Sequence, residues 1–364
     1  MSSTLDTPIA PRRLRHRAID LVGLLTTPLL PTDYLDLVSP LRSGAADLRG
    51  RIVAIAPETR DAVTIVIRPG RGWLGHRPGQ YVRLGVDVEG VRHWRAYSLT
   101  SPAGRRDGCI TITVKAMPDG LVSTHLVRHA SAGTLVHLDQ ACGEFTLPAR
   151  VPERVLFVTA GSGITPVMGM LRSGLLDDAD VVVAHSAPTP ADVIFASDLR
   201  KLAAQRRIRL VERHTDVDGM LGADELARLV PDLAQRETWA CGPAGMLEAL
   251  EAHWTARGVG DRLHVERFRP TALVIGDGGT VTFSTSGVEV AGDGATSILD
   301  AGESAGVLMP SGCRMGICFG CVLPMREGAV RDLRNGAITT AVPGDGVRIQ
   351  TCINAAAGPC HLEH

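Results

Sequence analysis

Residues 309–321 read Met-Pro-Ser-Gly-Cys-Arg-Met-Gly-Ile-Cys-Phe-Gly-Cys, the stretch from which the organisation of the chain can be worked out. Its cysteines, Cys313, Cys318 and Cys321, are spaced C-x4-C-x2-C, and Cys352 follows after thirty intervening residues. This spacing is typical of a plant-type [2Fe–2S] centre, in which four thiolates converge on two irons. Glycines between the cysteines let one short loop bend sharply enough to deliver three ligands. The sequence therefore predicts that these four cysteines bind a [2Fe–2S] cluster.

The competing interpretations of these cysteines are a zinc site or ordinary buried thiols. Zinc sites favour paired C-x2-C units, and the chain contains one such pair. A disulfide framework is typical of short secreted chains whose cysteines are spread throughout, whereas five of the eight cysteines here lie near the C-terminus. Cys360 lies outside the ligand spacing and is interpreted as an ordinary small residue.

Length and charge limit the possible functions. A chain of 364 residues predicts two or three domains. The formal net charge of −1 and the aromatic content of 4% argue against a nucleic-acid partner. The basic stretch that contains Arg12, Arg13, Arg15 and Arg17 precedes no cleavable apolar core, so no signal peptide is expected. We expect a cytoplasmic protein, with possible peripheral membrane contact through this basic segment.

Hydrophobic patterning divides the chain into a leader and three domains. Short β-rich runs separated by turns favour an antiparallel barrel, and alternating strands and helices favour a parallel α/β sheet. One of those helices is expected near 191–204. A hairpin and a helix then precede the cysteine loop. The predicted divisions are a leader at 1–47, an antiparallel barrel at 48–150, a parallel α/β domain at 151–270, a linker at 271–278 and a domain with the cysteine loop at 279–364.

Arg95-Ala96-Tyr97-Ser98 lies at the end of a predicted barrel strand. It resembles the Arg-x-Tyr-Ser flavin motif of the ferredoxin–NADP reductase superfamily. In that motif an arginine pairs with a flavin phosphate, a tyrosine packs on the isoalloxazine ring, and a hydroxyl reaches flavin N5, where hydride arrives. Read alone, so short a motif is also compatible with an exposed strand end.

Gly120-Leu121-Val122-Ser123 opens a predicted helix after a strand. The unpaired N–H groups of a helix N-terminus are a natural site for a second phosphate. This favours FAD, which has a diphosphate, over FMN. The alternative is a plain turn with an N-cap.

Gly161, Gly163, Thr165 and Pro166 belong to a strand–turn–helix segment, Gly161-Ser-Gly-Ile-Thr-Pro166. It departs from the dinucleotide fingerprint G-x-G-x-x-G. Its Gly-x-Gly-x-x-Pro form nevertheless resembles the nicotinamide-binding turn of the same superfamily. Cys241-Gly242-Pro243, which also follows a strand, resembles the second nicotinamide element; alone, Cys241 would be read as a buried structural thiol.

The resemblance to this superfamily covers about residues 48–364. Stretch 309–321 resembles the ferredoxin domains fused to bacterial oxygenase and desaturase reductases, which implies a β-grasp fold at the C-terminus, after the barrel and a Rossmann-like α/β domain. Glu266 and Phe268 stand where many relatives keep an acid beside an aromatic near the flavin. The chain looks most like the reductases of actinobacterial membrane acyl-CoA desaturases and the phenylacetyl-CoA and hydroxylase reductases.

The resemblance implies a reductase that moves electrons from NAD(P)H through FAD and the [2Fe–2S] cluster to an oxygenase or membrane acyl desaturase. The catalytic candidates are Ser98, Cys241 and Glu266. The alternatives are an FMN-containing reductase of a Rieske-type dioxygenase and a redox-sensing protein with the same cofactors.

Two finer expectations concern specificity and docking. Ser186 stands where NADH enzymes often carry an acid for the ribose diol, and Arg200 and Lys201 follow, so NADPH is preferred. Pro188 stands where relatives often have a phosphate-reading arginine. Arg314, inside the cysteine loop, is expected to make cluster reduction easier, and Arg314 or Arg331 is expected to lie near the docking partner.

Overall fold

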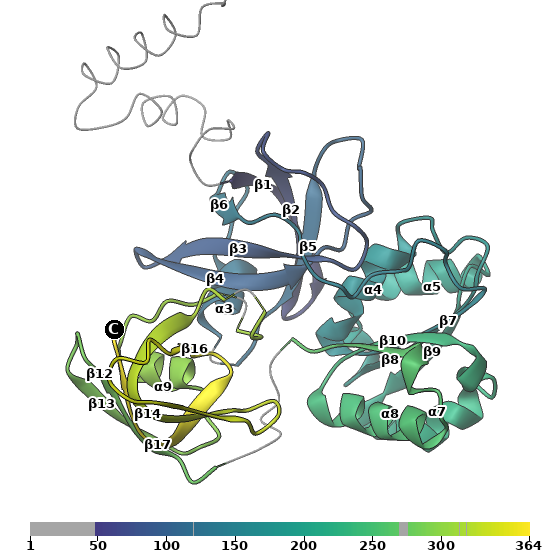
Figure 1. Ribbon diagram of the computed structural model, residues 1–364. Helices are drawn as coiled ribbons and strands as arrows, with labels where there is room; N and C mark the ends of the chain where they lie inside the picture. Colours follow the sequence, from purple (N-terminus) through teal and green to yellow (C-terminus); the bar gives the residue numbers. More distant parts are fainter. Residues whose placement is uncertain (1–47, 119, 269–275, 313, 318) are drawn as a thin grey trace, which may run out of the picture.

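The computed structural model describes residues 48–118, 120–268, 276–312, 314–317 and 319–364. They form three sheets, each with a core of its own (Figure 1). Within the described ranges, no helix is long and apolar enough to cross a membrane.

Sheet A is six-stranded and antiparallel, in the order β4-β3-β6-β1-β2-β5. A bridge between Leu99 and Ile112 brings the two edge strands together and closes the barrel. Ile52, Ile65 and Ile67 are fully buried inside it, and α3 (Leu121–Arg128) packs on β5 and β3. The strands are β1 (Arg49–Thr59), β2 (Ala62–Pro69), β3 (Tyr81–Val88), β4 (Val91–Ser98), β5 (Ile110–Lys115) and β6 (Leu135–Leu138).

Sheet B is five-stranded and parallel, in the order β11-β10-β7-β8-β9. Strands β7 and β8 are nearly continuous apolar runs because helices cover both faces of the sheet. One apolar cluster lies under α4 and α5 and another under α7 and α8 (Figure 1). The strands are β7 (Arg154–Ala160), β8 (Asp180–Ala187), β9 (Arg209–His214), β10 (Glu237–Cys241) and β11 (Leu263–Glu266).

The helices of the sheet B unit follow its strands in alternation. The expected helix near 191–204 is two elements, because Pro190 starts a short 3-10 turn and Phe195 then adopts a left-handed backbone with φ 62°. The α-helices are α4 (Ile164–Leu171), α5 (Ala196–Ala204), α6 (Thr215–Asp218), α7 (Ala223–Leu229) and α8 (Ala244–Ala256). The 3-10 turns are η1 (Gly161–Gly163), η2 (Pro190–Asp192), η3 (Leu233–Gln235) and η4 (Gly260–Arg262).

Sheet C is mixed, in the order β13-β12-β17-β14-β15, with β16 paired to β14. β12 and β17 run parallel, and the other pairs are antiparallel. The helix α9 (Ile298–Ser304) begins at Ser297, whose hydroxyl accepts the Asp300 N–H at 3.1 Å. The strands are β12 (Gly279–Phe283), β13 (Val288–Gly292), β14 (Val322–Asp332), β15 (Ile338–Ala341), β16 (Arg348–Gln350) and β17 (Asn354–Leu362).

The predicted fold class is confirmed, because an antiparallel barrel, a parallel α/β sheet and a mixed α+β sheet follow one another along the chain. The sequence-based domain boundaries fall between these sheets and stay a prediction. The sequence-based leader, 1–47, lies outside the described residues, as does most of the linker.

Arg236 is buried, with 4% of its side chain exposed. It links the start of β8 to the segment that precedes β10. Its Nη1 donates to the Asp180 carbonyl at 2.9 Å, its Nη2 to Asp180 Oδ2 at 2.5 Å and its Nε to Asp232 Oδ1 at 3.0 Å. A buried cation with three such bonds leaves uncompensated charges when it is removed.

We predict that Arg236→Gln lowers the local free energy of unfolding of β8 and β10 by about 3 kcal/mol. Native-state hydrogen exchange of amides in these strands measures it, since this method resolves the units of a multidomain chain. Arg200→Gln is the control, because its pair with Glu212 is half exposed and should contribute about 0.5 kcal/mol. Equal losses in the two variants would contradict the prediction.

Candidate functional site

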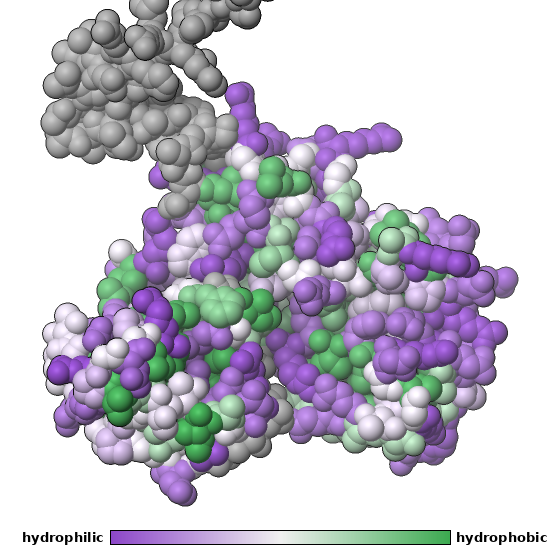
Figure 2. Space-filling view, in the orientation of Figure 1, coloured by the Kyte–Doolittle hydropathy of each residue, from purple (hydrophilic) through white to green (hydrophobic). Residues whose placement is uncertain are grey.

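The three sheets meet around one cleft of about 1550 Å³. The space-filling view shows apolar residues gathered near this junction (Figure 2). Most sequence-predicted site residues line it: Arg95, Ala96, Tyr97, Ser98, Gly120, Leu121, Val122, Ser123, Gly161, Gly163, Thr165, Ser186, Gly242, Pro243, Glu266, Phe268 and Cys352. Pro166, Cys241 and Cys321 do not line it and lie buried.

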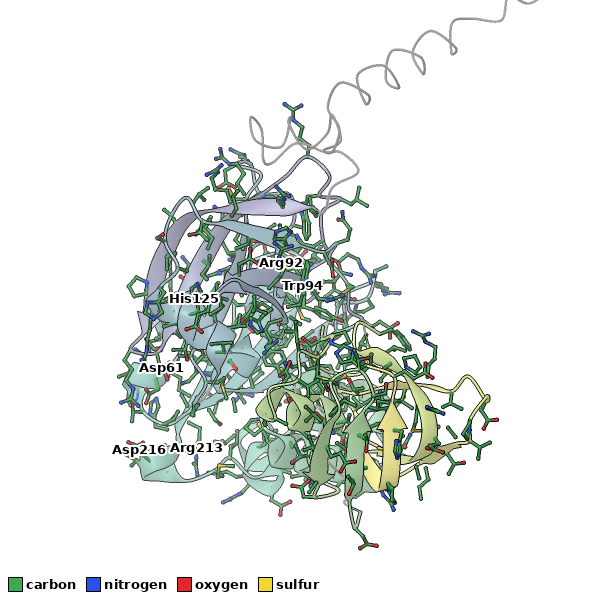
Figure 3. The ribbon with its side chains drawn as sticks, turned by 90° about the vertical axis from the view of Figure 1, so that its left-hand side faces the viewer. Asp61, Arg92, Trp94, His125, Arg213 and Asp216 are labelled. Atoms are coloured by element: carbon green, nitrogen blue, oxygen red, sulfur yellow. The ribbon has the colours of Figure 1, made fainter. Side chains whose placement is uncertain are left out.

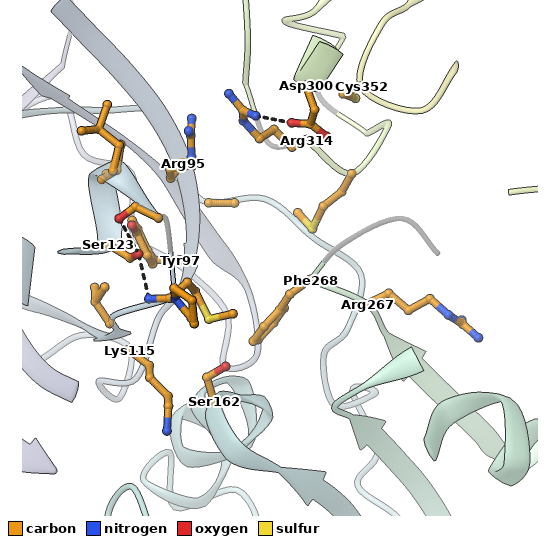
Figure 4. Close-up of a pocket in the computed structure, with 18 of the residues that line it drawn as sticks. Arg95, Tyr97, Lys115, Ser123, Ser162, Arg267, Phe268, Asp300, Arg314 and Cys352 are labelled. Atoms are coloured by element: carbon orange, nitrogen blue, oxygen red, sulfur yellow. Dashed lines mark hydrogen bonds and ion pairs between the residues drawn. The ribbon is translucent and has the colours of Figure 1, made fainter. Parts of the chain in front are cut away.

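Strand β4 presents its cleft-lining side chains in a row. Residues two apart on a strand point to the same face, so Tyr97, Arg95 and His93 follow one another on one side of β4. Burial raises the pKa of Tyr97, which keeps its phenol neutral. Burial also holds the pKa of Arg95 below its ordinary value. The Arg95 guanidinium donates to the Trp94 carbonyl at 2.8 Å and keeps further N–H donors for an anion (Figure 4).

The first turn of α3 faces the same cleft from the barrel side. The Ser123 hydroxyl donates to the Gly120 carbonyl at 3.2 Å and accepts the Met117 N–H at 3.1 Å. This local bonding fixes the turn that starts the helix. The first backbone N–H groups of a helix have no intrahelical acceptor and suit a phosphate.

The glycine turn after β7 lies directly against the end of β10. A Cβ on Gly163 would come within 2.0 Å of the Cys241 carbonyl oxygen, so only glycine fits. The Thr165 hydroxyl donates to the Ser162 carbonyl at 2.9 Å and stabilises the turn. The two segments that resemble nicotinamide-binding elements are therefore in contact at the carboxyl edge of the parallel sheet, where ligands of such sheets bind.

Cys241 and Glu266 are register partners on the neighbouring strands β10 and β11. Burial raises the pKa of Glu266 to about 8, and burial with the nearby Glu266 carboxyl raises the pKa of the Cys241 thiol. Glu266 Oε2 is buried with no hydrogen-bond partner among the residues that the structure describes. The cleft thus contains a carboxyl group that stays protonated at neutral pH and can donate a hydrogen bond or a proton.

Ser186 is the next-to-last residue of β8. Its hydroxyl is buried and has no hydrogen-bond partner in the described part of the chain. The expected cations are not beside it: Arg200 pairs with Glu212 at 2.8 Å, and neither Arg200 nor Lys201 lines the cleft. Arg213, on the next strand, pairs with Glu225 and donates to the Gly219 carbonyl, so it holds the loop around α6 (Figure 3).

The end of the cysteine loop, at Cys321, lies close to Cys352, the fourth predicted cluster ligand, in the unit of sheet C. Cys321 and Cys352 are buried, and the Thr351 N–H and hydroxyl both donate to the Cys321 carbonyl, at 3.1 and 2.9 Å. Cys313 and Cys318 lie outside the described residues. These bonds bring the Cys321 and Cys352 segments together, and thiols are the soft ligands that iron–sulfur clusters use.

Arg314 corrects one expectation from the sequence. Its Nη1 donates to Asp300 Oδ1 at 2.7 Å, and its Nη2 donates to both oxygens of Glu303. Two carboxylates compensate its charge, so Arg314 is not an unopposed cation that eases cluster reduction. It also faces the inter-sheet cleft rather than the outside of the molecule.

Lys115, which belongs to none of the motifs, and Met315, inside the cysteine loop, also line the cleft. Lys115 pairs with Asp61 at 3.2 Å and extends toward the turn that contains Ser162 (Figure 4). It brings a cation to the side where the phosphates of a nicotinamide dinucleotide would enter. The sequence could not have predicted that Lys115 lies near a phosphate site, because the turn with Ser162 belongs to a different sheet.

The residues present fit FAD, a nicotinamide dinucleotide and a [2Fe–2S] cluster. The half-buried Tyr97 and Arg95 and a helix N-terminus offer one ring contact and two phosphate contacts, and Glu266, whose Oε2 has no partner among the described residues, lines the same cleft. Phe268 lies across the cleft from Tyr97 (Figure 4). When bound, the flavin supplies the conversion between two-electron hydride transfer and one-electron transfer.

Comparison with known proteins agrees with this geometry. Residues 60–147 match the oxidoreductase FAD-binding domain, 157–252 the oxidoreductase NAD-binding domain, and 281–354 the 2Fe-2S iron-sulfur cluster binding domain. The chain is 49% identical over 355 residues to an NADPH oxidoreductase of Mycobacterium tuberculosis, covering 96% of this chain and 92% of the relative. It is 31% identical over 303 residues to the NADH oxidoreductase HCR of Escherichia coli, covering 82% and 92%.

Among solved structures, phthalate dioxygenase reductase is similar with a TM-score of 0.58 and 23% identity, covering 88% of this chain and 98% of that one. That likeness supports the fold. The chain belongs to the ferredoxin–NADP reductase superfamily, among the members with a C-terminal iron–sulfur domain. It is an NAD(P)H-dependent flavoprotein oxidoreductase that uses FAD and a [2Fe–2S] cluster.

We predict that flavin reduction by NADPH slows as pH rises through about 8, because Glu266 loses its proton there and becomes a buried anion beside the flavin. In Glu266→Gln, which cannot ionise, this transition should be absent. Stopped-flow measurement of flavin bleaching across the pH range tests it. An unchanged transition in Glu266→Gln would assign the titration to another group.

Proposed function

We propose that this protein takes hydride from NADPH at the cleft and delivers single electrons through its [2Fe–2S] cluster to an oxygenase or a membrane acyl desaturase. One observation carries the proposal. Tyr97 of the flavin motif, Gly161 of the nicotinamide turn and Cys352 of the cluster set line the same cleft, although they belong to three sheets. Such convergence suits the passage of electrons between three redox groups.

The roles that we assign follow from these positions. Arg95 and the Gly120–Ser123 turn hold the flavin phosphates, and Tyr97 packs on its ring. Ser98, at the buried end of β4, hydrogen-bonds near the reacting nitrogen. Glu266 holds a proton at the hydride site, and Cys241 supports it from the neighbouring strand. Cys313, Cys318, Cys321 and Cys352 hold the cluster, within a ferredoxin domain that we place at 279–364, after the flavin domain at 48–150 and the nicotinamide domain at 151–270.

The proposed class of acceptor rests on the relatives. A stachydrine N-demethylase reductase subunit of Rhizobium meliloti is 30% identical over 327 residues, and a 3-ketosteroid-9-alpha-monooxygenase ferredoxin reductase component of Mycobacterium tuberculosis is 31% identical over 309. Both are named as reductase components. The desaturase alternative rests on the basic leader alone. Capture with the cluster-bearing protein, read by mass spectrometry, separates the two.

We place the protein in the cytoplasm, with the leader arginines near an anionic membrane surface. Each basic residue near such a surface contributes about 1 kcal/mol of attraction. Sedimentation with phosphatidylglycerol vesicles tests the contact. A chain starting at Leu48 that sediments equally well would contradict the leader's role.

NADPH is the proposed donor, because Ser186 leaves the end of β8 without an acid for a ribose diol. The name of the relative at 49% identity is consistent with this choice. We predict that Ser186→Asp reverses the preference toward NADH by about tenfold or more, since a carboxylate repels a 2′-phosphate and accepts from a ribose diol. The ratio of kcat/KM values for the two donors measures it, and a wild-type preference for NADH would refute the proposed donor.

Loss of the cluster should leave flavin reduction intact and remove the transfer of electrons from the flavin through the cluster. We predict that Cys352→Ser retains NADPH–ferricyanide activity, which can draw on the flavin directly, while cytochrome c reduction falls by about tenfold or more. Cys360→Ala is the matched control, since Cys360 is equally buried in sheet C but lies outside the ligand spacing. Parallel loss of both activities in Cys352→Ser would show that the cluster is not the exit route.

A further inference from the structure

Arg314 is held in an unusual backbone conformation by its own side-chain bonds. Its φ of 59° lies in the left-handed region that costs a non-glycine residue energy. The guanidinium reaches two carboxylates three residues apart on one face of α9, Asp300 at 2.7 Å and Glu303 at 2.5 Å. These bonds fasten the loop between the first two cluster cysteines to the helix of the same unit. We name Arg314, Asp300 and Glu303 the loop clamp.

The loop clamp faces the flavin motif across the cleft. All three of its residues line the cleft together with Arg95 and His93 of β4 (Figure 4). Burial lowers the pKa of both Arg95 and His93; the Arg314 cation lowers it further and the Glu303 carboxylate partly offsets this, so the charges of the clamp act across the gap between the two sheets. One arginine and two carboxylates leave the clamp with a net charge of −1 opposite the Arg95 cation.

The same loop has a second face. Ile317 and Phe319 are 55% and 67% exposed and do not line the cleft. Arg314 thus faces the flavin unit, whereas Ile317 and Phe319 face solvent. Arg314 is therefore placed for the entry of electrons into the cluster, in contrast to the docking role expected from the sequence.

We propose that Arg314 is a positioning residue that holds the cluster loop against α9 and thereby sets how the cluster faces the flavin. This inference rests on the proposed function. The step concerned is the transfer of one electron from reduced FAD to the oxidised cluster: the flavin is oxidised by one electron, the cluster is reduced by one, and no bond between them forms or breaks. Its rate depends on placement, as with other positioned reactants.

The test uses the full chain with both cofactors. In Arg314→Gln we expect NADPH to bleach the flavin within about twofold of the wild-type rate, while cluster reduction slows by about tenfold or more. Arg326→Gln is the control, because Arg326 is an exposed arginine on β14 of the same unit and does not line the cleft. It should leave both steps within about twofold of wild type.

A second measurement separates positioning from general damage. After chemical reduction of the cluster with dithionite and removal of the excess, its oxidation by cytochrome c should be unchanged in Arg314→Gln, since the exit face is untouched. Amide exchange over α9 should be faster in this variant even without flavin, because the helix loses its contacts to the loop. Cluster reduction within twofold of wild type, or unchanged exchange over α9, would overturn the proposal.

If Arg314→Gln does not retain its cluster, a further pair of variants still tests the proposal. Asp300→Asn and Glu303→Gln each remove one half of the clamp without changing the loop, and each should slow cluster reduction but not flavin bleaching. Normal cluster reduction in both would also overturn the proposal. A wild-type enzyme whose flavin NADPH cannot bleach would instead refute the proposed function, and the exchange measurement on α9 would still decide the clamp.

Discussion

The constraint on which this structure depends is that three sheets with separate cores must present their functional edges to one cleft. Electrons pass efficiently only between groups that are held close, so the flavin, nicotinamide and cluster residues have to converge. Sheet B meets this demand with its carboxyl edge, where Gly163 lies against the Cys241 carbonyl. Sheet A contributes β4, and the unit of sheet C contributes α9 and the part of the cysteine loop that contacts it.

The charge of each group in the cleft depends on its ion-pair partner and on its burial. The cations that compensate carboxylates, such as Arg314 and Lys115, are fixed by those carboxylates, whereas Arg95 keeps donors for an anion. Glu266 shows the opposite solution, because burial without a compensating partner keeps its carboxyl protonated at neutral pH. The same space therefore offers a cation for phosphate and a neutral acid near the hydride position.

Much of this protein could be predicted from local patterns. The cysteine spacing predicted the iron–sulfur domain, and the switch from period-two strands to alternating strands and helices predicted the fold class. The split of the expected helix near Ala191–Ala204 was missed, because a left-handed Phe195 is not readable from residue types.

The sequence by itself determined which chemical groups are present and on which elements, because ligand spacing, turns and hydrophobic periods are local properties of the chain. Only the tertiary structure decided which charges remain available. Arg314 and Arg200 look like unopposed cations in the sequence, yet each finds a carboxylate on another element, eleven to fourteen positions away for Arg314 and twelve for Arg200. Pairing, burial and the facing of a loop toward one neighbour or another depend on packing between distant segments, which no local pattern encodes.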